Sequence, residues 1–242
     1  MVLPFARMVR KVSIRRSERS CLERVRPDQD TVSRLAPNPY YQEKYRSVEH
    51  LYWLHIPAWI DAFCADRVVD RILDVGCAYG TLLVHGKRIT GAQPFGLDFI
   101  DAFMSPALAA DQGIDFRIGN VELEALPWSH RFDMVIFTEV LEHFNFQAVP
   151  TLVKVRNAVS DRGRLFLSTP DSAEWGRTYK YYRRYADLPD PGLGHPIHDD
   201  HVWQFNRKEL EAVVAEAGWQ IRRLAYAPGD GRRHFNLEAV AG

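Results

Sequence analysis

One short stretch decides the fold of this chain: Arg71-Ile72-Leu73-Asp74-Val75-Gly76-Cys77-Ala78-Tyr79-Gly80. Its first half is the apolar run expected of a central parallel strand. Its second half holds small residues, which let the backbone turn sharply and approach a ligand closely. A helix beginning near Thr81 would direct its free N–H groups toward whatever lies over the turn. The stretch therefore predicts a ligand-binding loop between a buried strand and a helix.

A second strand narrows the kind of ligand. The segment Pro94-Phe95-Gly96-Leu97-Asp98 ends in an acid, 24 positions after Asp74. At that spacing a carboxylate can accept both hydroxyls of an adenosine ribose. The loop departs from the dinucleotide fingerprint because it contains an acid at Asp74 and its small residues follow Gly-x-Ala-x-Gly. Both departures favour an adenosine-containing ligand without a pyrophosphate.

The rest of the chain alternates between strand and helix patterns, which predicts a doubly wound α/β fold. The expected strands are Ile72–Val75, Pro94–Leu97, Asp115–Ile118, Phe132–Thr138, Arg164–Ser168, Gln220–Tyr226 and His234–Ala239. The expected helices are Thr81–Lys87, Phe103–Ala110, Phe146–Val159 and Arg207–Ala217. The last two strands flank the turn Pro228-Gly229-Asp230-Gly231 and read as an antiparallel hairpin. We expect a seven-stranded sheet, parallel except for that C-terminal hairpin.

These motifs resemble those of the class I S-adenosylmethionine-dependent methyltransferases, whose first motif is Asp-x-Gly-x-Gly-x-Gly. Ala78 replaces the middle glycine. The resemblance covers about residues 70 to 240 and continues through Asn120-Val121-Glu122, Phe132-Asp133-Met134-Val135-Ile136-Phe137, Glu139-Val140-Leu141-Glu142-His143 and Leu165-Phe166-Leu167-Ser168-Thr169-Pro170. It implies a Rossmann-like methyltransferase fold and S-adenosylmethionine as the cofactor.

The cofactor is expected beyond the carboxyl ends of the parallel strands. Gly76, Ala78 and Gly80 would lie beside its methionine part, with Asp74 at the amino group. Asp98 would bind the ribose. The remaining expected cofactor residues are Asn120, Val121 or Glu122 at the adenine edge, Phe99 with Ile100 flanking the adenine, and Thr138 at the end of the fourth strand.

A cluster of acids and histidines is the candidate for chemistry. Glu139, Glu142 and His143 would share one face if a helix began there. A hydroxyl acceptor must lose its proton, so a base or a metal that lowers its pKa would help. We therefore expect Glu142 and His143 to be catalytic. Together with Glu139 and His201 they could instead hold a divalent metal, Mg²⁺ or Mn²⁺.

Two groups of methyltransferases resemble this arrangement. The ubiquinone-biosynthesis-type O-methyltransferases share Glu-Val-Leu-Glu-His. In the Hen1-type small-RNA 2′-O-methyltransferases, Glu-x-x-Glu-His and a later His-x-Asp-His bind a metal, and the segment from His198 to Arg207 is similar to the later part. The first expectation is therefore O-methylation of a small molecule, sugar or lipid-linked metabolite. The alternatives are a Hen1-like RNA methyltransferase and a non-catalytic cofactor-binding module.

The ends and inserts of the chain complete its organisation. Residues 1–38 form a basic extension, which is either a solvated tail or an arm that contacts RNA or a membrane surface. Residues 39–242 form the methyltransferase domain, with an aromatic cap helix at about 40–65 and an irregular insertion at about 171–205 that we expect to be a lid.

Composition sets broad limits on the protein. Its 242 residues are 46% apolar and carry 31 basic and 31 acidic side chains, so no global field attracts nucleic acid or membrane. Cys21, Cys64 and Cys77 lack paired or metal-type spacing, which predicts a reduced, cytoplasmic protein. Neither a membrane span nor a signal peptide is expected.

Overall fold

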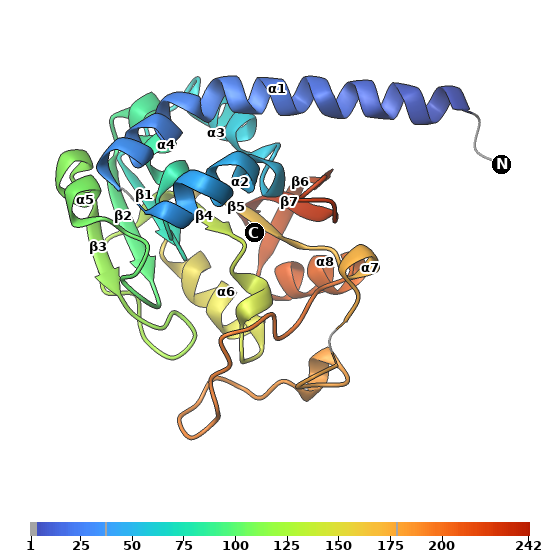
Figure 1. The fold of residues 1–242 in the computed structure, drawn as a ribbon. Helices are drawn as coiled ribbons and strands as arrows, with labels where there is room; N and C mark the ends of the chain where they lie inside the picture. The colour runs from blue at the N-terminus through green and yellow to red at the C-terminus, as the bar shows by residue number, and fades with distance from the viewer. Residues whose placement is uncertain (1–3, 37, 178) are drawn as a thin grey trace.

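The computed structural model describes residues 4–36, 38–177 and 179–242, and the side chains of these residues from position 16 onward. Within them, seven strands form one sheet in the order β3-β2-β1-β4-β5-β7-β6 (Figure 1). The strands are β1 Arg71–Val75, β2 Gln93–Asp98, β3 Asp115–Ile118, β4 Phe132–Thr138, β5 Val159–Pro170, β6 Trp219–Ala227 and β7 His234–Ala241. The first five are parallel, and β7 pairs antiparallel with both β5 and β6. The predicted sheet is confirmed, and β5 is longer than expected at both ends.

The helices also follow the sequence pattern, with shifted bounds. They are α1 Pro4–Leu35, η1 Tyr41–Tyr45, α2 Arg46–Tyr52, α3 Ile56–Cys64, α4 Thr81–Thr90, α5 Pro106–Gln112, η2 Leu141–His143, α6 Ala148–Asn157, α7 Ser172–Trp175, η3 Tyr185–Asp187 and α8 Arg207–Glu216. The expected single cap helix is a π turn, η1, that runs into α2 and is followed by α3. The helix expected at Phe103 begins instead at Pro106, where the Ser105 side chain caps its first turn.

Helices cover both faces of the sheet, so the protein has one hydrophobic core on each face. The side chains of β4 alternate between these two cores. Met134 and Ile136 point into one core with buried residues of α1, α3, α4 and α5. Val135 and Phe137 alternate with them and pack into the other core, with residues of α6 and α8. This period of two over a fully buried run is what a central strand of a doubly wound sheet requires.

Helix α1 lies along the first of these faces, and its N-terminal end projects beyond the sheet (Figure 1). Val25 and Val32 are buried in the core that contains α4. The basic residues expected to form an arm begin at Arg7, and those before Arg16 lie outside the described side chains. The division of the chain at residue 38 remains a prediction.

A buried ion network fastens α1 to α3 and α4. Nδ1 of His85 lies 2.9 Å from Oδ2 of Asp28, and its Nε2 lies 3.0 Å from Oδ1 of Asp61. Arg88 also donates to Asp28, at 2.7 Å, and Arg24 pairs with Asp61. Burial lowers the pKa of His85, but the bonds to the two carboxylates outweigh it and leave the pKa above 6.5.

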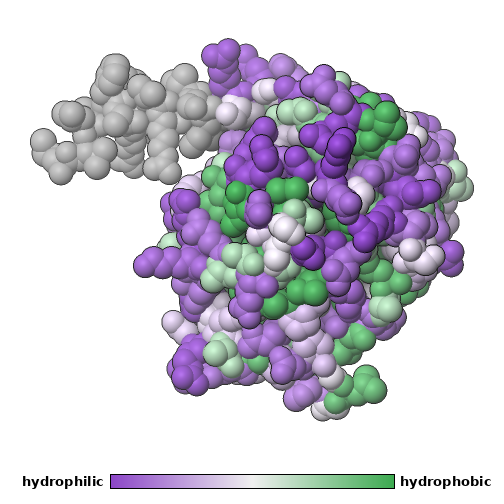
Figure 2. All heavy atoms as spheres, turned by 180° about the vertical axis from the view of Figure 1, so that it is seen from behind, coloured by the Kyte–Doolittle hydropathy of each residue, from purple (hydrophilic) through white to green (hydrophobic). Residues whose placement is uncertain are grey.

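The face opposite to that of Figure 1 is mainly hydrophilic, with apolar side chains in separate patches (Figure 2). None of the described helices combines the length and apolarity needed to cross a membrane. Cys21, Cys64 and Cys77 are all free thiols.

Candidate functional site

The loop between β1 and α4 has the backbone that its small residues predicted. Gly76 and Gly80 have φ values of 70° and 75°, and Gly80 is the N-cap of α4. A Cβ built on Gly76 would lie 2.1 Å from Cγ2 of Val140, so a side chain there is excluded both by sterics and by conformation. Ala78 also has a positive φ, 41°, at the position where the resemblance expects glycine.

Asp74 lies at the end of β1 with its carboxylate buried, at 3% exposure. Its Oδ1 has no hydrogen-bond partner among the described residues. Burial and the nearby Asp98 raise the pKa of Asp74 well above 3.8. A buried carboxylate oxygen without a donor is costly, and it suits a ligand that brings a positive donor such as an ammonium group. This is the fit expected for the amino group of S-adenosylmethionine.

Asp98 ends β2 on the other side of the loop. Its Oδ2 accepts a 2.8 Å hydrogen bond from the Ala78 N–H, and its Oδ1 accepts one from Ile100 at 3.3 Å. One donor on each oxygen leaves lone pairs for ribose hydroxyls. Asp98 lines a cavity of about 300 Å³, as do Gly76 and Ala78.

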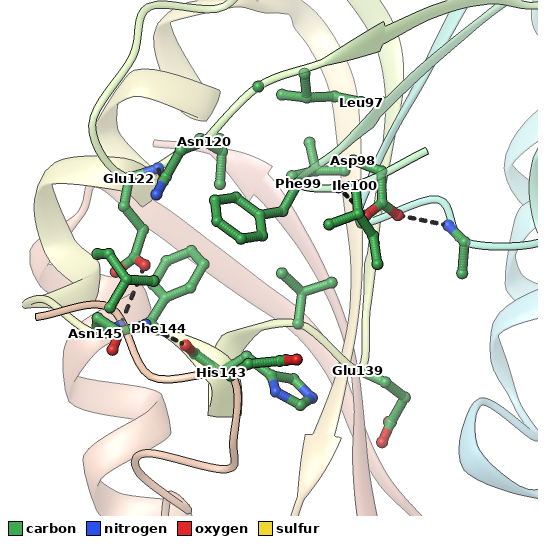
Figure 3. Close-up of a pocket in the computed structure, with 18 of the residues that line it drawn as sticks. Leu97, Asp98, Phe99, Ile100, Asn120, Glu122, Glu139, His143, Phe144 and Asn145 are labelled. Carbon is green, nitrogen blue, oxygen red and sulfur yellow. Dashed lines mark hydrogen bonds between the residues drawn. The ribbon is translucent and has the colours of Figure 1, made fainter. Parts of the chain in front are cut away.

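The same cavity has apolar walls (Figure 3). Phe99 and Ile100 come from one side and remain 56% and 41% exposed, while His143 and Phe144 approach from the opposite side. Exposed apolar side chains that face a cavity suit a flat aromatic ring. The expected adenine position therefore has a suitable environment.

The three residues expected at the adenine edge have different surroundings. Asn120 and Val121 line the cavity. Glu122 also lines it, but its carboxylate accepts the backbone N–H groups of Asn145 and Phe146 at 3.1 and 2.9 Å. Burial raises its pKa to about 7, although these two bonds oppose the shift. Glu122 therefore holds the chain after η2 at the cavity wall.

A second, smaller cavity of about 80 Å³ lies at the other side of the glycine loop. Asp74 and Thr138 line it, together with Glu139. It also contains Glu49 of α2, a residue that no sequence motif indicated. The segment 40–65 contains three acids, Glu43, Glu49 and Asp61, and no spacing or motif separates Glu49 from the other two.

Glu142, His143 and His201 form the one cluster among the described residues that could hold a metal. One ligand atom from each lies within 4.8 Å of the others. Nδ1 of His143 lies 3.0 Å from the carbonyl oxygen of Asp200, which fixes the ring and leaves Nε2 free. The buried Glu142 carboxylate accepts the Thr169 hydroxyl at 2.9 Å. Burial raises the pKa of Glu142 and lowers those of His143 and His201.

Glu139 is not part of that cluster. Glu139, Glu142 and His143 would share a face only if a helix began at Glu139, and none does: Glu139 has a φ of 57°, and the 3₁₀ turn η2 covers only Leu141–His143. Its carboxylate accepts a 2.6 Å bond from Ser168 and lies 2.8 Å from Nδ1 of His234. The distance between His234 and Glu139 is that of an ion pair, but the geometry is not that of a hydrogen bond. Sequence reasoning missed His234 because only the position of β7 beside β5 brings it here.

The segment expected to be a lid reaches the larger cavity through Ile197, His198 and Asp199. Asn145 fixes this segment by accepting from the His198 N–H at 2.7 Å and donating to the His198 carbonyl at 3.2 Å. The Tyr181 ring stacks on His198 with centroids 4.0 Å apart. Residue 178 lies outside the described chain.

Comparison with known proteins places this chain in a family. The sequence model of the methyltransferase-domain family matches residues 32–224. A ubiquinone biosynthesis O-methyltransferase of Acinetobacter baylyi is 27% identical over 172 residues, which cover 69% of this chain and 70% of that protein. The corresponding Bordetella parapertussis protein is 31% identical over 116 residues, and the match spans about half of it, 47%. A probable S-adenosylmethionine-dependent methyltransferase of Mycolicibacterium smegmatis is 27% identical over 179 residues, 72% of this chain and 61% of that protein.

Solved structures share the architecture at lower sequence identity. Magnesium protoporphyrin IX methyltransferase from Synechocystis, crystallised with S-adenosylhomocysteine, has a TM-score of 0.60 and 18% identity over 85% of this chain and 88% of its own. An S-adenosylmethionine-dependent methyltransferase from Mesorhizobium loti has a TM-score of 0.57 and 18% identity over 77% and 97%. At these identities the likeness shows the fold.

Proposed function

The chain belongs to the methyltransferase-domain family, as a class I S-adenosylmethionine-dependent methyltransferase, and from that premise we propose that it methylates an oxygen atom of a small-molecule acceptor. The observation that carries this proposal is the cluster of Glu142, His143 and His201, because His143 also lines the cavity expected to hold the cofactor. An acceptor that is already nucleophilic would not need such a cluster. A hydroxyl acceptor, whose proton must leave, would.

The cofactor supplies a methyl group on a sulfonium centre, and the chain's task is to hold that group in line with the acceptor. We assign Asp74 to the amino group and Asp98 to the ribose. Phe99 and Ile100 would take the faces of the adenine. The assignments follow the unpartnered oxygen of Asp74, the spare lone pairs of Asp98 and the exposed apolar side chains beside them.

We further propose that the cluster holds a divalent metal. One carboxylate and two imidazoles suit Mn²⁺, Fe²⁺ or Zn²⁺ better than Mg²⁺, which prefers oxygen ligands. When bound, such a metal would lower the pKa of an acceptor hydroxyl. The Asp200 carbonyl orients the His143 ring for this role, and Thr169 fixes the Glu142 carboxylate.

The names of the relatives support a small-molecule acceptor and an oxygen target. The proteins of Acinetobacter baylyi and Bordetella parapertussis are named for O-methylation in ubiquinone biosynthesis. The proposal extends only the class of reaction to this chain, and not the acceptor.

The test is transfer of labelled methyl from S-adenosylmethionine into fractionated cell extract, with and without a chelator. We expect label in the small-molecule fraction, carried on oxygen, which is lost with the chelator and restored by Mn²⁺. Label confined to RNA, or carried on nitrogen or carbon, would contradict the proposal. Full activity in the presence of the chelator would exclude a role for a metal, and His143 would then be the candidate general base.

Two variants locate the chemistry. We expect Glu142→Gln and His201→Gln each to lower methyl transfer at least tenfold and to lower bound Mn²⁺ in parallel. His195→Gln is the matched control, because His195 is an exposed histidine of the same insertion that lies outside the cluster. Equal activity of all three variants would exclude the cluster from catalysis.

A further inference from the structure

We propose that Glu49 binds the α-ammonium group of the cofactor's methionine part, so that the N-terminal helices complete the cofactor site. This inference rests on the binding of S-adenosylmethionine and not on the acceptor, so it stands or fails independently of O-methylation. Glu49 belongs to α2, outside the strand-end motifs that assign the rest of the site. Its side chain is 2% exposed, and it lines the smaller cavity beside Asp74.

The hydrogen bonds of Glu49 leave one of its oxygens available. Oε1 accepts from Nε2 of Gln29 at 2.8 Å and from the Tyr41 hydroxyl at 2.9 Å. Oε2 lies 3.0 Å from Oγ1 of Thr81, whose single proton is also shared with Oε1 at 3.2 Å. Each carboxylate oxygen can accept about two bonds. Oε2 of Glu49, a residue that lines the cavity, therefore keeps acceptor capacity.

Asp74 provides an independent indication of a cationic ligand here. Asp74 lines the same cavity, and its buried Oδ1 lacks a partner among the described residues. None of the residues that line this cavity is a lysine, arginine or histidine, whereas three of them, Glu49, Asp74 and Glu139, are acids. A ligand with a positive group would offset the cost of holding these carboxylates out of water.

The cavity also provides a donor for the other end of an amino acid. Tyr79 lines it, and the buried Tyr79 hydroxyl has no partner in the described part of the chain. An ammonium group needs acceptors and a carboxylate group needs donors, so Tyr79 and the two acids offer what a methionine head requires. A simple metal cation would leave the Tyr79 donor unused.

The alternative is that Glu49 only joins helices. Its partners lie on α1, on η1 and at the first residue of α4, so it would fasten these elements even without a ligand. Burial raises its pKa to about 7, against the bonds from Gln29, Tyr41 and Thr81. If Glu49 were purely structural, its loss would weaken the binding of every ligand of the site equally. If it binds the ammonium group, its loss would weaken only ligands that carry that group.

The experiment compares two ligands by calorimetry. S-adenosylhomocysteine carries the α-amino group, and its des-amino analogue carries hydrogen in that place. We expect Glu49→Gln to lower the affinity for S-adenosylhomocysteine at least tenfold and to change the affinity for the analogue less than twofold. Only S-adenosylhomocysteine carries the ammonium group. An equal loss for both ligands, or no loss for either, would overturn the proposal.

Tyr41→Phe is the matched control. It removes one bond to Oε1 of Glu49 and keeps the carboxylate, so we expect both affinities to fall by less than threefold. If Tyr41→Phe discriminated between the two ligands as strongly as Glu49→Gln, the effect would come from helix docking and the proposal would fail.

A measurement on the unmodified protein covers the case in which Glu49→Gln does not fold. We expect saturating S-adenosylhomocysteine to slow amide hydrogen exchange in Arg46–Tyr52 by at least fivefold, and the analogue to slow it less than twofold. Equal protection by both ligands would contradict a role of Glu49 at the amino group.

Discussion

The hydroxyl of Ser168 donates a 2.6 Å hydrogen bond to the carboxylate of Glu139, and this bond joins the ends of β4 and β5 between the two cavities. The bond is as short as a hydroxyl–carboxylate pair usually becomes. Glu139 also has a positive φ, 57°, which a side chain holds only where its surroundings favour it. Ser168 therefore stabilises an unusual conformation at the centre of the site.

We expect Ser168→Ala to lower the free energy of unfolding by about 1.5–3 kcal/mol, because the charged Glu139 carboxylate, whose side chain is only 17% exposed, loses its donor. Urea denaturation measures this. Ser160→Ala is the control: Ser160 also donates to a carboxylate, Asp133, at 3.0 Å, but it is only partly buried. Equal losses for the two variants would show that the Ser168 bond is an ordinary one.

Gly76 permits a second comparison. We expect Gly76→Ala to lower the free energy of unfolding by roughly 2 kcal/mol more than Gly91→Ala. Both glycines have nearly the same φ, 70° and 73°, so both variants incur the left-handed cost of about 1–2 kcal/mol. Only Gly76 would place its new Cβ against Val140, since Gly91 has nothing within 4 Å. Equal destabilisation in urea would refute the close approach.

At Ala78 we expect a substitution to stabilise the fold, in contrast to Gly76→Ala. Its φ of 41° is costly for a residue with a Cβ and free for glycine. The greater freedom of glycine in the unfolded chain offsets part of that gain. We expect Ala78→Gly to raise the free energy of unfolding by about 0.5 kcal/mol, measured by urea denaturation. A loss of more than about 0.5 kcal/mol would show that the Ala78 methyl packs favourably.

The His85 network predicts how stability depends on pH. The pKa of His85 lies above 6.5 in the folded protein, so its bonds to Asp28 and Asp61 stabilise the fold fully below about pH 6.5. That stabilisation is lost as the pH rises through the folded pKa. We expect the difference in unfolding free energy between the unmodified protein and His85→Gln to shrink from pH 6 to pH 9.

Urea titrations at the two pH values measure this difference, and His195→Gln provides an exposed histidine for comparison. A difference that grows with pH would mean that His85 is neutral in the folded state.

Asn145 is expected to control the segment that reaches the larger cavity. We expect Asn145→Ala to speed amide hydrogen exchange at residues 197–201 at least tenfold, because both bonds to His198 are lost. Exchange in β4 should not change, which controls for global unfolding. If residues 197–201 remained protected, the stacking of Tyr181 on His198 would suffice to hold the segment.

Much of the fold was predictable because its signals are local. Ile72–Val75 is an apolar run before a turn, and Asp115–Ile118 and Phe132–Thr138 have the observed bounds. The shared face of Glu139, Glu142 and His143 depended on a helix that began at Glu139, and that condition is not met because Glu139 has a positive φ that spacing alone does not reveal. A motif that suits a helix can also suit a turn.

The site was predictable only where it lies at strand ends. Asp74, Asp98 and the Glu142–His143 pair follow strands that share one edge, so topology brings them together. Glu49 and His234 had no such signal. Glu49 is placed by helix packing, and His234 by the register in which β7 pairs it with Pro170 of β5. Long-range register of this kind is not encoded in a local pattern.

The insertion of β7 between β5 and β6 has a consequence for how the protein is made. His234, which contacts Glu139, belongs to the strand that β5 must pair with, and that strand follows the other six strands in the sequence. Until residue 241 has left the ribosome, β5 presents an unpaired edge to the cell. We therefore expect the newly made chain to expose this edge to aggregation between the synthesis of its fifth and seventh strands, and the contact between His234 and Glu139 forms only after that interval.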